Sequence, residues 1–190
     1  MKRLVWVCSV LCLLLLPVPL ASAHKAHEHG RAKVNIVVDG SLVSIGLESP
    51  LDSLLSFEHV PATFEQRKQV KEMARRMHQA ETLFQLTPAA ECRLERVALA
   101  SEILDPVLLD PNIPLDPAQA DKSKAQSGKA EHADLDAEFF FTCGKPENLN
   151  SVNVLLFSVW PKMERIAVQA VTPKGQRAAN LTPGRHLVSW

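Results

Sequence analysis

Imidazole side chains gather in one short stretch of the sequence. Three of the seven histidines, His24, His27 and His29, lie within six residues, and Glu28 stands between two of them. Neutral imidazole is the commonest protein ligand for zinc, and carboxylates complete many zinc sites. In an extended segment His27 and His29 project to the same side, so both could bind one ion. The stretch therefore predicts a metal site.

Other potential ligands follow later in the chain. His59 comes after Glu58 in a segment bounded by prolines, and His132 begins a row of alternating acidic residues. The predicted principal ligands of a Zn(II) site are His27, His29, His59 and His132. Glu48, Asp134 and Asp136 are predicted as additional ligands or as groups that orient the imidazoles. The alternative for the acidic row is an ordinary solvent-facing strand.

Residues 1–23 have the three zones of a cleavable signal peptide. Lys2 and Arg3 form the basic start, an apolar run extends from residue 4 to residue 16, and Ala21-Ser22-Ala23 is a small-residue cleavage site. The apolar run is too short for a comfortable membrane span. We expect an exported chain of residues 24–190 that forms one domain, resides in the periplasm and is not inserted in the membrane.

Composition narrows the functional classes. Without Lys2 and Arg3, the 21 basic and 21 acidic side chains of the sequence become 19 and 21. This near balance gives no strong positive electrostatic field that would attract nucleic acid or anionic lipid.

Cys92 and Cys143 are the two cysteines outside the leader, and an exported chain most simply pairs them in a disulfide. The alternatives are two buried free thiols or a pair of metal ligands.

Alternating apolar residues on both sides of Asp39-Gly40 predict a β-hairpin over residues 31–48. If Asp39-Gly40 is a two-residue loop, Arg31 lies opposite Glu48. His29 then lies one diagonal step from Glu48, close enough to share a ligand. A surface ion pair between Arg31 and Glu48 is the alternative.

The remaining elements point to an α+β fold. Thr63-x-x-Gln66 reads as a capping box that opens a helix to about Gln79, with Met73 and Met77 on its core-facing stripe. The predicted later strands are 92–103, with a bulge near Arg96, and 132–143, 152–159, 166–171 and 176–181. Proline and polar residues over 105–130 predict a mobile loop. The predicted domain has a mainly antiparallel sheet of six or seven strands with one long helix packed on it.

Two further kinds of chemistry find little support in the sequence. It has no G-x-S-x-G, no H-E-x-x-H and no phosphate-binding glycine loop, so we expect a protein that is not an enzyme. Cleavage before His24 would permit copper binding by its amine and imidazole. Copper binding at His24 therefore stays an alternative, although the chain has no tyrosine and no aromatic-rich substrate face.

Several motifs together resemble a known family, the ZrgA-type zinc-regulated periplasmic proteins. The matching segments are His27-Glu-His29-Gly30, Leu47-Glu48-Ser-Pro50, Phe57-Glu58-His59-Val-Pro61, residues 132–141 with Cys143, and Val171-Thr-Pro-Lys-Gly-Gln176. The resemblance covers most of the chain after the leader. Ser56 departs from it, because a glycine is usual before the Phe-Glu-His element.

The resemblance implies a function in metal supply. Such a protein would bind zinc in the periplasm of a Gram-negative bacterium and support uptake alongside a zinc ABC importer or its periplasmic binding protein. The long loop of such proteins is often histidine-rich, whereas here it has only His132 at its end, which favours a single structured site. The second hypothesis is an envelope module whose helix face and sheet edge bind a protein partner, with incidental histidines.

Overall fold

The computed structural model describes residues 29–115 and 133–190. Nine strands form two sheets, a six-stranded sheet in the order β4-β5-β2-β1-β7-β8 and a three-stranded sheet in the order β3-β6-β9. The strands are β1 (Arg31–Asp39), β2 (Leu42–Pro50), β3 (Phe84–Leu86), β4 (Cys92–Ala100), β5 (Asp134–Cys143), β6 (Ser151–Val154), β7 (Arg165–Thr172), β8 (Gly175–Leu181) and β9 (Leu187–Ser189). The helices are α1 (Leu51–Leu55), α2 (Phe64–Met77), α3 (Ala80–Leu83), α4 (Pro106–Leu109) and α5 (Leu156–Val159).

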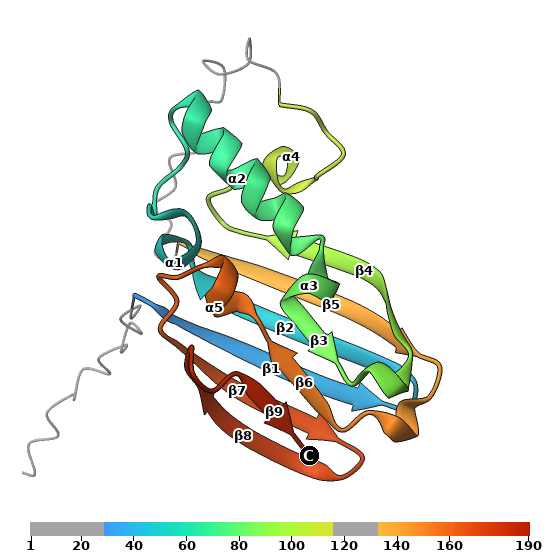
Figure 1. Cartoon of the computed structure of the whole chain (residues 1–190). Helices are drawn as coiled ribbons and strands as arrows, with labels where there is room; N and C mark the ends of the chain where they lie inside the picture. The colour runs from blue at the N-terminus through green and yellow to red at the C-terminus, as the bar shows by residue number, and fades with distance from the viewer. Residues whose placement is uncertain (1–28, 116–132) are drawn as a thin grey trace, which may run out of the picture.

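The helices and the small sheet lie over one face of the large sheet (Figure 1). The strands alternate accordingly, because every second residue points into the core between these layers. In β1 the buried residues are Ala32, Val34, Ile36 and Val38. In β5 they are Leu135, Ala137, Phe139, Phe141 and Cys143. The alternating residues of β1 and the carboxylates Asp136 and Glu138 of β5 face outward and are exposed.

The predicted hairpin is confirmed, but its register is shifted. Asp39 pairs with Leu42, which leaves Gly40 and Ser41 as the loop, and Glu48 lies opposite Lys33 and not opposite Arg31. Gly40 has φ +58°, whereas Ser41 does not take a positive φ, so glycine occupies the first loop position as in a type II′ turn. The shift moves each partner by two residues, so the same side chains stay in the core.

The predicted capping box and core stripe of α2 are confirmed. The backbone N–H of Gln66 donates to Thr63 Oγ1 at 3.2 Å, and the N–H of Thr63 donates to Gln66 Oε1 at 3.3 Å. Met73 and Met77 are buried in the core. They therefore act as packing residues and not as metal ligands.

The disulfide between Cys92 and Cys143 is present and joins directly paired residues of β4 and β5. The predicted bulge in this part of β4 is also present, because the pairing with β5 shifts between Leu94 and Arg96. Since both thiols are oxidised, the cysteines are excluded as metal ligands.

The predicted mainly antiparallel sheet is confirmed in the six-stranded sheet, in which β1 and β7 are the one pair that runs parallel; the second, three-stranded sheet was not predicted. Three predictions about the elements need correction. One long helix does not describe the helical part, since the described residues form five helices, of which only α2 exceeds seven residues. Residues 152–159 do not form one strand but divide into β6 and α5. The start of the predicted mobile loop forms α4, whose Leu108 and Leu109 are buried.

A lysine on α2 holds α4 and the residue that follows it. Lys71 Nζ donates to the carbonyl oxygens of Val107, at 2.8 Å, and Asp110. Residues 116–130 of the predicted loop lie outside the described residues. Among the helices of the described ranges, none has the length and apolar character that a membrane crossing needs.

Candidate functional site

A tight turn at Gly30 fixes the backbone next to His29. Gly30 donates its N–H to Ser53 Oγ of α1 at 3.1 Å, and its carbonyl oxygen accepts from the N–H groups of Glu164 and Arg165 at 2.7 and 3.0 Å. Gly30 has φ +74°, and a Cβ at this position would lie 3.0 Å from the carbonyl oxygen of Lys162. Only glycine fits such a conformation and such a close approach.

This turn brings His29 to two carboxylates that follow β2. His29 Nδ1 lies 3.4 Å from Asp52 Oδ2, on α1, and 3.6 Å from Glu58 Oε1, in the loop after α1. The side chains remain partly open to solvent, with 66% of His29, 25% of Asp52 and 35% of Glu58 exposed. An ion could therefore reach the cluster without an opening of the fold.

The chemistry and the two distances from His29 fit zinc. Tetrahedral zinc with bonds of about 2.0–2.1 Å requires donor atoms about 3.3–3.4 Å apart. The separation of His29 Nδ1 from the Asp52 oxygen equals that spacing, and its separation from the Glu58 oxygen is slightly longer. However, no group of three or more His, Cys, Asp or Glu side chains in the described ranges is arranged as a complete metal site. The described residues of the cluster therefore do not form a complete metal site by themselves.

A cation of the protein itself already contacts this cluster. Lys162 Nζ lies 3.3 Å from Asp52 Oδ1, so the two oxygens of Asp52 face a lysine on one side and a histidine on the other. Glu164 is also close, since its Cγ would lie 3.2 Å from a Cβ on Gly30. The site thus combines residues from the start of β1, from α1 and its loop, and from the segment before β7.

His59, a predicted principal ligand, has other partners in this structure. Its ring stacks on Phe57 with a centroid distance of 5.1 Å, and its Nδ1 donates to the carbonyl oxygen of Val60 at 3.0 Å. Its Nε2 lies 3.5 Å from the side-chain nitrogen of Gln66, which can donate to it. Both ring nitrogens are therefore engaged in holding the loop against the first turn of α2. Binding of metal by His59 would require these contacts to break.

The predicted acidic ligands share one face of the large sheet, as the sequence pattern indicated. Glu48 pairs across the strands with Asp136, and Asp134 lies opposite Pro50. Glu48 does not lie beside His29 as the predicted register required, because the hairpin is shifted; instead it forms an ion pair with Lys33. These carboxylates are thus on the outer face, whereas Asp52 and Glu58 are the ones that contact His29.

The outer face holds its carboxylates in an unfavourable arrangement. Burial raises the pKa of Asp136, and the negative charges of Glu48, Asp134 and Glu102 raise it further, while Lys33 acts in the opposite direction. A shallow hollow of about 340 Å³ lies beside these side chains and includes the small residues of β2 and β4. Crowding of like charges is what a bound cation would relieve, but a row of acidic residues alone does not define a site.

Three predicted ligands, His24, His27 and His132, lie outside the described residues. Two of them are close in sequence to well-defined points of the site. His27 is two residues before His29. His132 precedes Ala133, whose carbonyl oxygen accepts from the N–H of Leu51, the first residue of α1, at 2.8 Å. Their roles stay predictions.

The comparisons agree with these observations. The model of a family described as ZrgA family zinc uptake protein matches residues 26–190. The chain belongs to the ZrgA family. The match includes every described residue of the cluster and the whole of both sheets. A comparison with curated proteins found no match.

Sequence reasoning missed Asp52, Glu58 and Lys162 in this ZrgA-family protein. Glu58 stands next to His59, so its place in the Phe-Glu-His element was a usable signal. Asp52 and Lys162 gave no signal of their own, because their meeting depends on α1 and on the turn at Gly30. His186 contacts the small sheet instead, where its Nδ1 lies 2.5 Å from Asn153 Oδ1.

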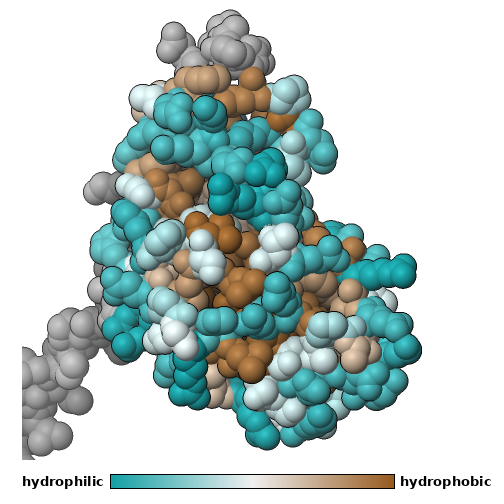
Figure 2. Space-filling view, in the orientation of Figure 1, coloured by the Kyte–Doolittle hydropathy of each residue, from teal (hydrophilic) through white to brown (hydrophobic). Residues whose placement is uncertain are grey.

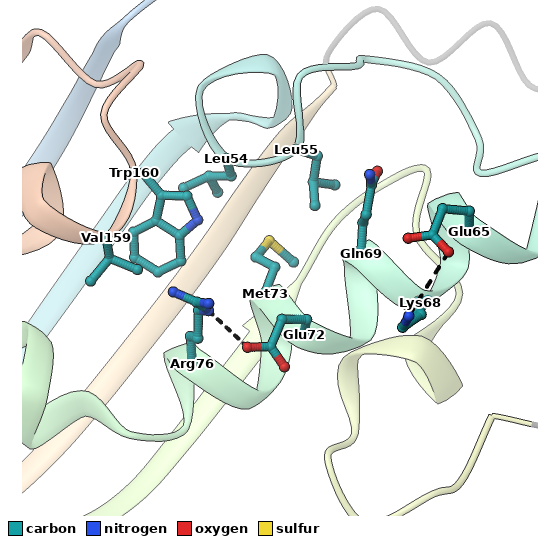
Figure 3. Close-up of a pocket in the computed structure, with 10 residues that line it drawn as sticks. All are labelled: Leu54, Leu55, Glu65, Lys68, Gln69, Glu72, Met73, Arg76, Val159 and Trp160. Carbon is teal, nitrogen blue, oxygen red and sulfur yellow. Dashed lines mark hydrogen bonds and ion pairs between the residues drawn. The ribbon is translucent and has the colours of Figure 1, made fainter.

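A groove lies beside the cluster, between α1, α2 and the end of α5. It has a volume of about 370 Å³, and apolar residues lie among pairs of opposite charge (Figure 3). The apolar lining residues are Leu54, Leu55, Met73, Val159 and Trp160. The charged side chains at its rim form ion pairs with one another, Glu65 with Lys68 and Glu72 with Arg76. Apolar surface is visible between helices and strands on this face of the molecule (Figure 2).

Proposed function

We propose that this protein binds Zn(II) reversibly in the periplasm and buffers or delivers it for uptake by an ABC importer. The observation that carries the proposal is the position of His29 at 3.4 and 3.6 Å from the carboxylates of Asp52 and Glu58, in a chain of the ZrgA family. Imidazole and carboxylate oxygens form a donor set that zinc accepts, and the disulfide leaves no thiolate to compete.

The remaining ligands are proposed from the sequence. His27 and His132 would complete the coordination, because His27 is two residues before His29 and His132 directly precedes Ala133, whose carbonyl oxygen accepts from the N–H of Leu51, the neighbour of Asp52. Glu164 and His59 are the described residues that could replace them after a rearrangement. Periplasmic location depends on the predicted signal peptide of residues 1–23. The proposed partner is the importer or its periplasmic binding protein.

The direct experiment is a zinc titration of the purified mature protein, residues 24–190. We expect stoichiometric binding that weakens at least about tenfold in His29→Ala and in Asp52→Asn, since each removes a ligand. The same titration of His27→Ala and His132→Ala tests the two predicted ligands outside the described residues. Binding should also weaken as the pH falls through about 6.5, where free imidazole is protonated.

His186→Ala is the matched control, because this histidine contacts Asn153 on the small sheet. Its zinc affinity should equal that of the wild type. Equal affinity of the wild type, His29→Ala and Asp52→Asn would refute the site, and absence of measurable zinc binding by the wild type would refute the function.

The groove beside α2 favours one alternative, an envelope module that binds a protein partner. Growth of cells under a zinc chelator separates the two functions. For a zinc-binding protein, His29→Ala and deletion of the gene should reduce growth alike. For a partner-binding module, cells with His29→Ala should grow as the wild type does. Charge reversals at Arg75 and Arg76 on α2 should instead reduce growth as deletion of the gene does.

A further inference from the structure

Lys162 is held beside the proposed zinc site by the backbone. Its carbonyl oxygen lies so close to Gly30 that a Cβ there would be 3.0 Å away, and the N–H groups of Glu164 and Arg165, which follow the buried Met163, both donate to the carbonyl oxygen of Gly30. Its side chain, by contrast, is 54% exposed and can change conformation. The structure therefore presents an ammonium group at the end of a partly exposed side chain whose backbone is held against the turn at Gly30.

The ammonium group contacts the same carboxylate that is proposed to bind zinc. Lys162 Nζ is 3.3 Å from Asp52 Oδ1, and His29 Nδ1 is 3.4 Å from Asp52 Oδ2. Two cations at one carboxylate repel each other, so zinc and the ammonium group bind Asp52 with negative coupling. The repulsion is moderated by solvent, because the lysine side chain is partly exposed.

We infer that Lys162 is an internal competitor of zinc, which neutralises Asp52 in the metal-free protein and weakens zinc binding enough to ease release. This inference rests on the proposed function and adds the control of affinity at the same site. A protein that hands its ion to a partner gains from a bound state that is not too stable, since the dissociation rate limits transfer. In this scheme Lys162 acts on zinc affinity through its charge at Asp52 and is not itself a ligand.

The experiment compares zinc affinity and zinc release in Lys162→Gln and in the wild type. Removing the ammonium group should tighten zinc binding by roughly two- to fivefold, the range of an exposed charge interaction. Release of zinc to an excess of a fluorescent chelator should slow by a similar factor, because affinity differences within one site appear mainly in the dissociation rate. Lys162→Arg retains the positive charge and should behave nearly as the wild type does.

Lys145→Gln is the matched control. It also removes one positive charge and one surface ion pair, with Glu91, but it does so near the disulfide between Cys92 and Cys143. Its affinity for zinc should stay at the wild-type value. Equal tightening in both variants would show a general effect of net charge and would overturn the inference.

The other outcomes are also decisive. Unchanged affinity in Lys162→Gln overturns the inference, and weaker binding overturns it as well, because the lysine would then be organising Asp52 for zinc. In both cases the proposed function stands if His29→Ala still loses affinity. Absence of zinc binding by the wild type rejects the proposed function itself, and the inference with it.

Discussion

Ser56 stands at the position where the resembling proteins usually have glycine, and its backbone explains that usage. It ends α1 with φ +69° and ψ +18°, in the left-handed region, and its N–H donates to the carbonyl oxygen of Asp52 at 3.0 Å. A side chain costs roughly 1–2 kcal/mol in this conformation, whereas glycine adopts it freely. The loop that follows carries Glu58 and His59, so a strained residue stands directly before two potential ligands.

Replacing this serine by glycine should stabilise the protein. We expect Ser56→Gly to raise the free energy of unfolding by roughly 0.5–1 kcal/mol, because relief of the backbone strain exceeds the extra entropy that glycine has in the unfolded chain. Urea denaturation measures the change. Ser41→Gly is the control, since Ser41 lies in the hairpin loop without a positive φ, and it should give no gain. Equal effects at both positions would contradict this account of Ser56.

Some residues of the candidate site can be recognised from the sequence alone, and others cannot. The histidine cluster could be recognised because residue type and spacing within a few positions are visible in the sequence. Asp52 could not be recognised as a partner of His29, because the two meet through the fold, where Gly30 donates its N–H to Ser53 of α1. A site that forms by contacts between segments far apart in the sequence leaves no local sequence pattern from which it could be predicted.

At the scale of elements, alternation predicted the strands well where one face is buried. β1, β2, β5 and β7 were found in this way, and for β1, β2 and β5 the faces of the side chains were found as well. The pattern failed over 152–159, because both faces are apolar there and periodicity cannot separate a strand from a short helix. The hairpin register failed by two residues, since the loop chemistry allowed Gly40 either as its first or its second residue.

The outer face of β2, β5 and β4 should make stability depend on pH through Asp136. Its raised carboxyl pKa means that the folded state disfavours the charged form, so the unfavourable contribution is absent at low pH and grows as the pH rises through the raised pKa. Asp136→Asn removes the charge and should increase the free energy of unfolding at neutral pH. Below pH 3 the variant and the wild type should be equally stable.

Urea denaturation at the two pH values tests this prediction. Glu138→Gln is the matched control, because Glu138 lies on the same face of β5 opposite Gly46 and Ala98 and has no like-charged neighbour directly across the strands. A destabilised Asp136→Asn at neutral pH would show that the carboxylate forms a favourable interaction that outweighs the repulsion.

At the scale of the whole molecule, the disulfide and the proposed zinc site lie at opposite ends of β5. The strand begins at Asp134, close to α1, and ends at Cys143, and its ten residues span about 30 Å. A substitution at one end of β5 therefore does not directly change the contacts at the other end. Stability and zinc affinity should be separable by mutation.

The double variant Cys92→Ser/Cys143→Ser tests this separation. Loss of a cross-link that closes a loop of 51 residues should lower the free energy of unfolding by roughly 2–4 kcal/mol, measured in urea. At a temperature where the variant remains folded, its zinc affinity should match that of the wild type. A large loss of affinity in the folded variant would instead show that zinc binding depends on the end of β5 that carries the disulfide.

The parallel pairing of β1 with β7 has a consequence for the order of assembly. Arg31 lies opposite Arg165, and the N–H groups that bind Gly30 come from the same late segment. The hairpin of β1 and β2 can form early, but its free side is filled only when the last third of the polypeptide arrives, and such non-local pairing is slow. A nascent or truncated chain would therefore present His29 without the surroundings that fix it, so the capacity to hold an ion would appear only as the final step of folding.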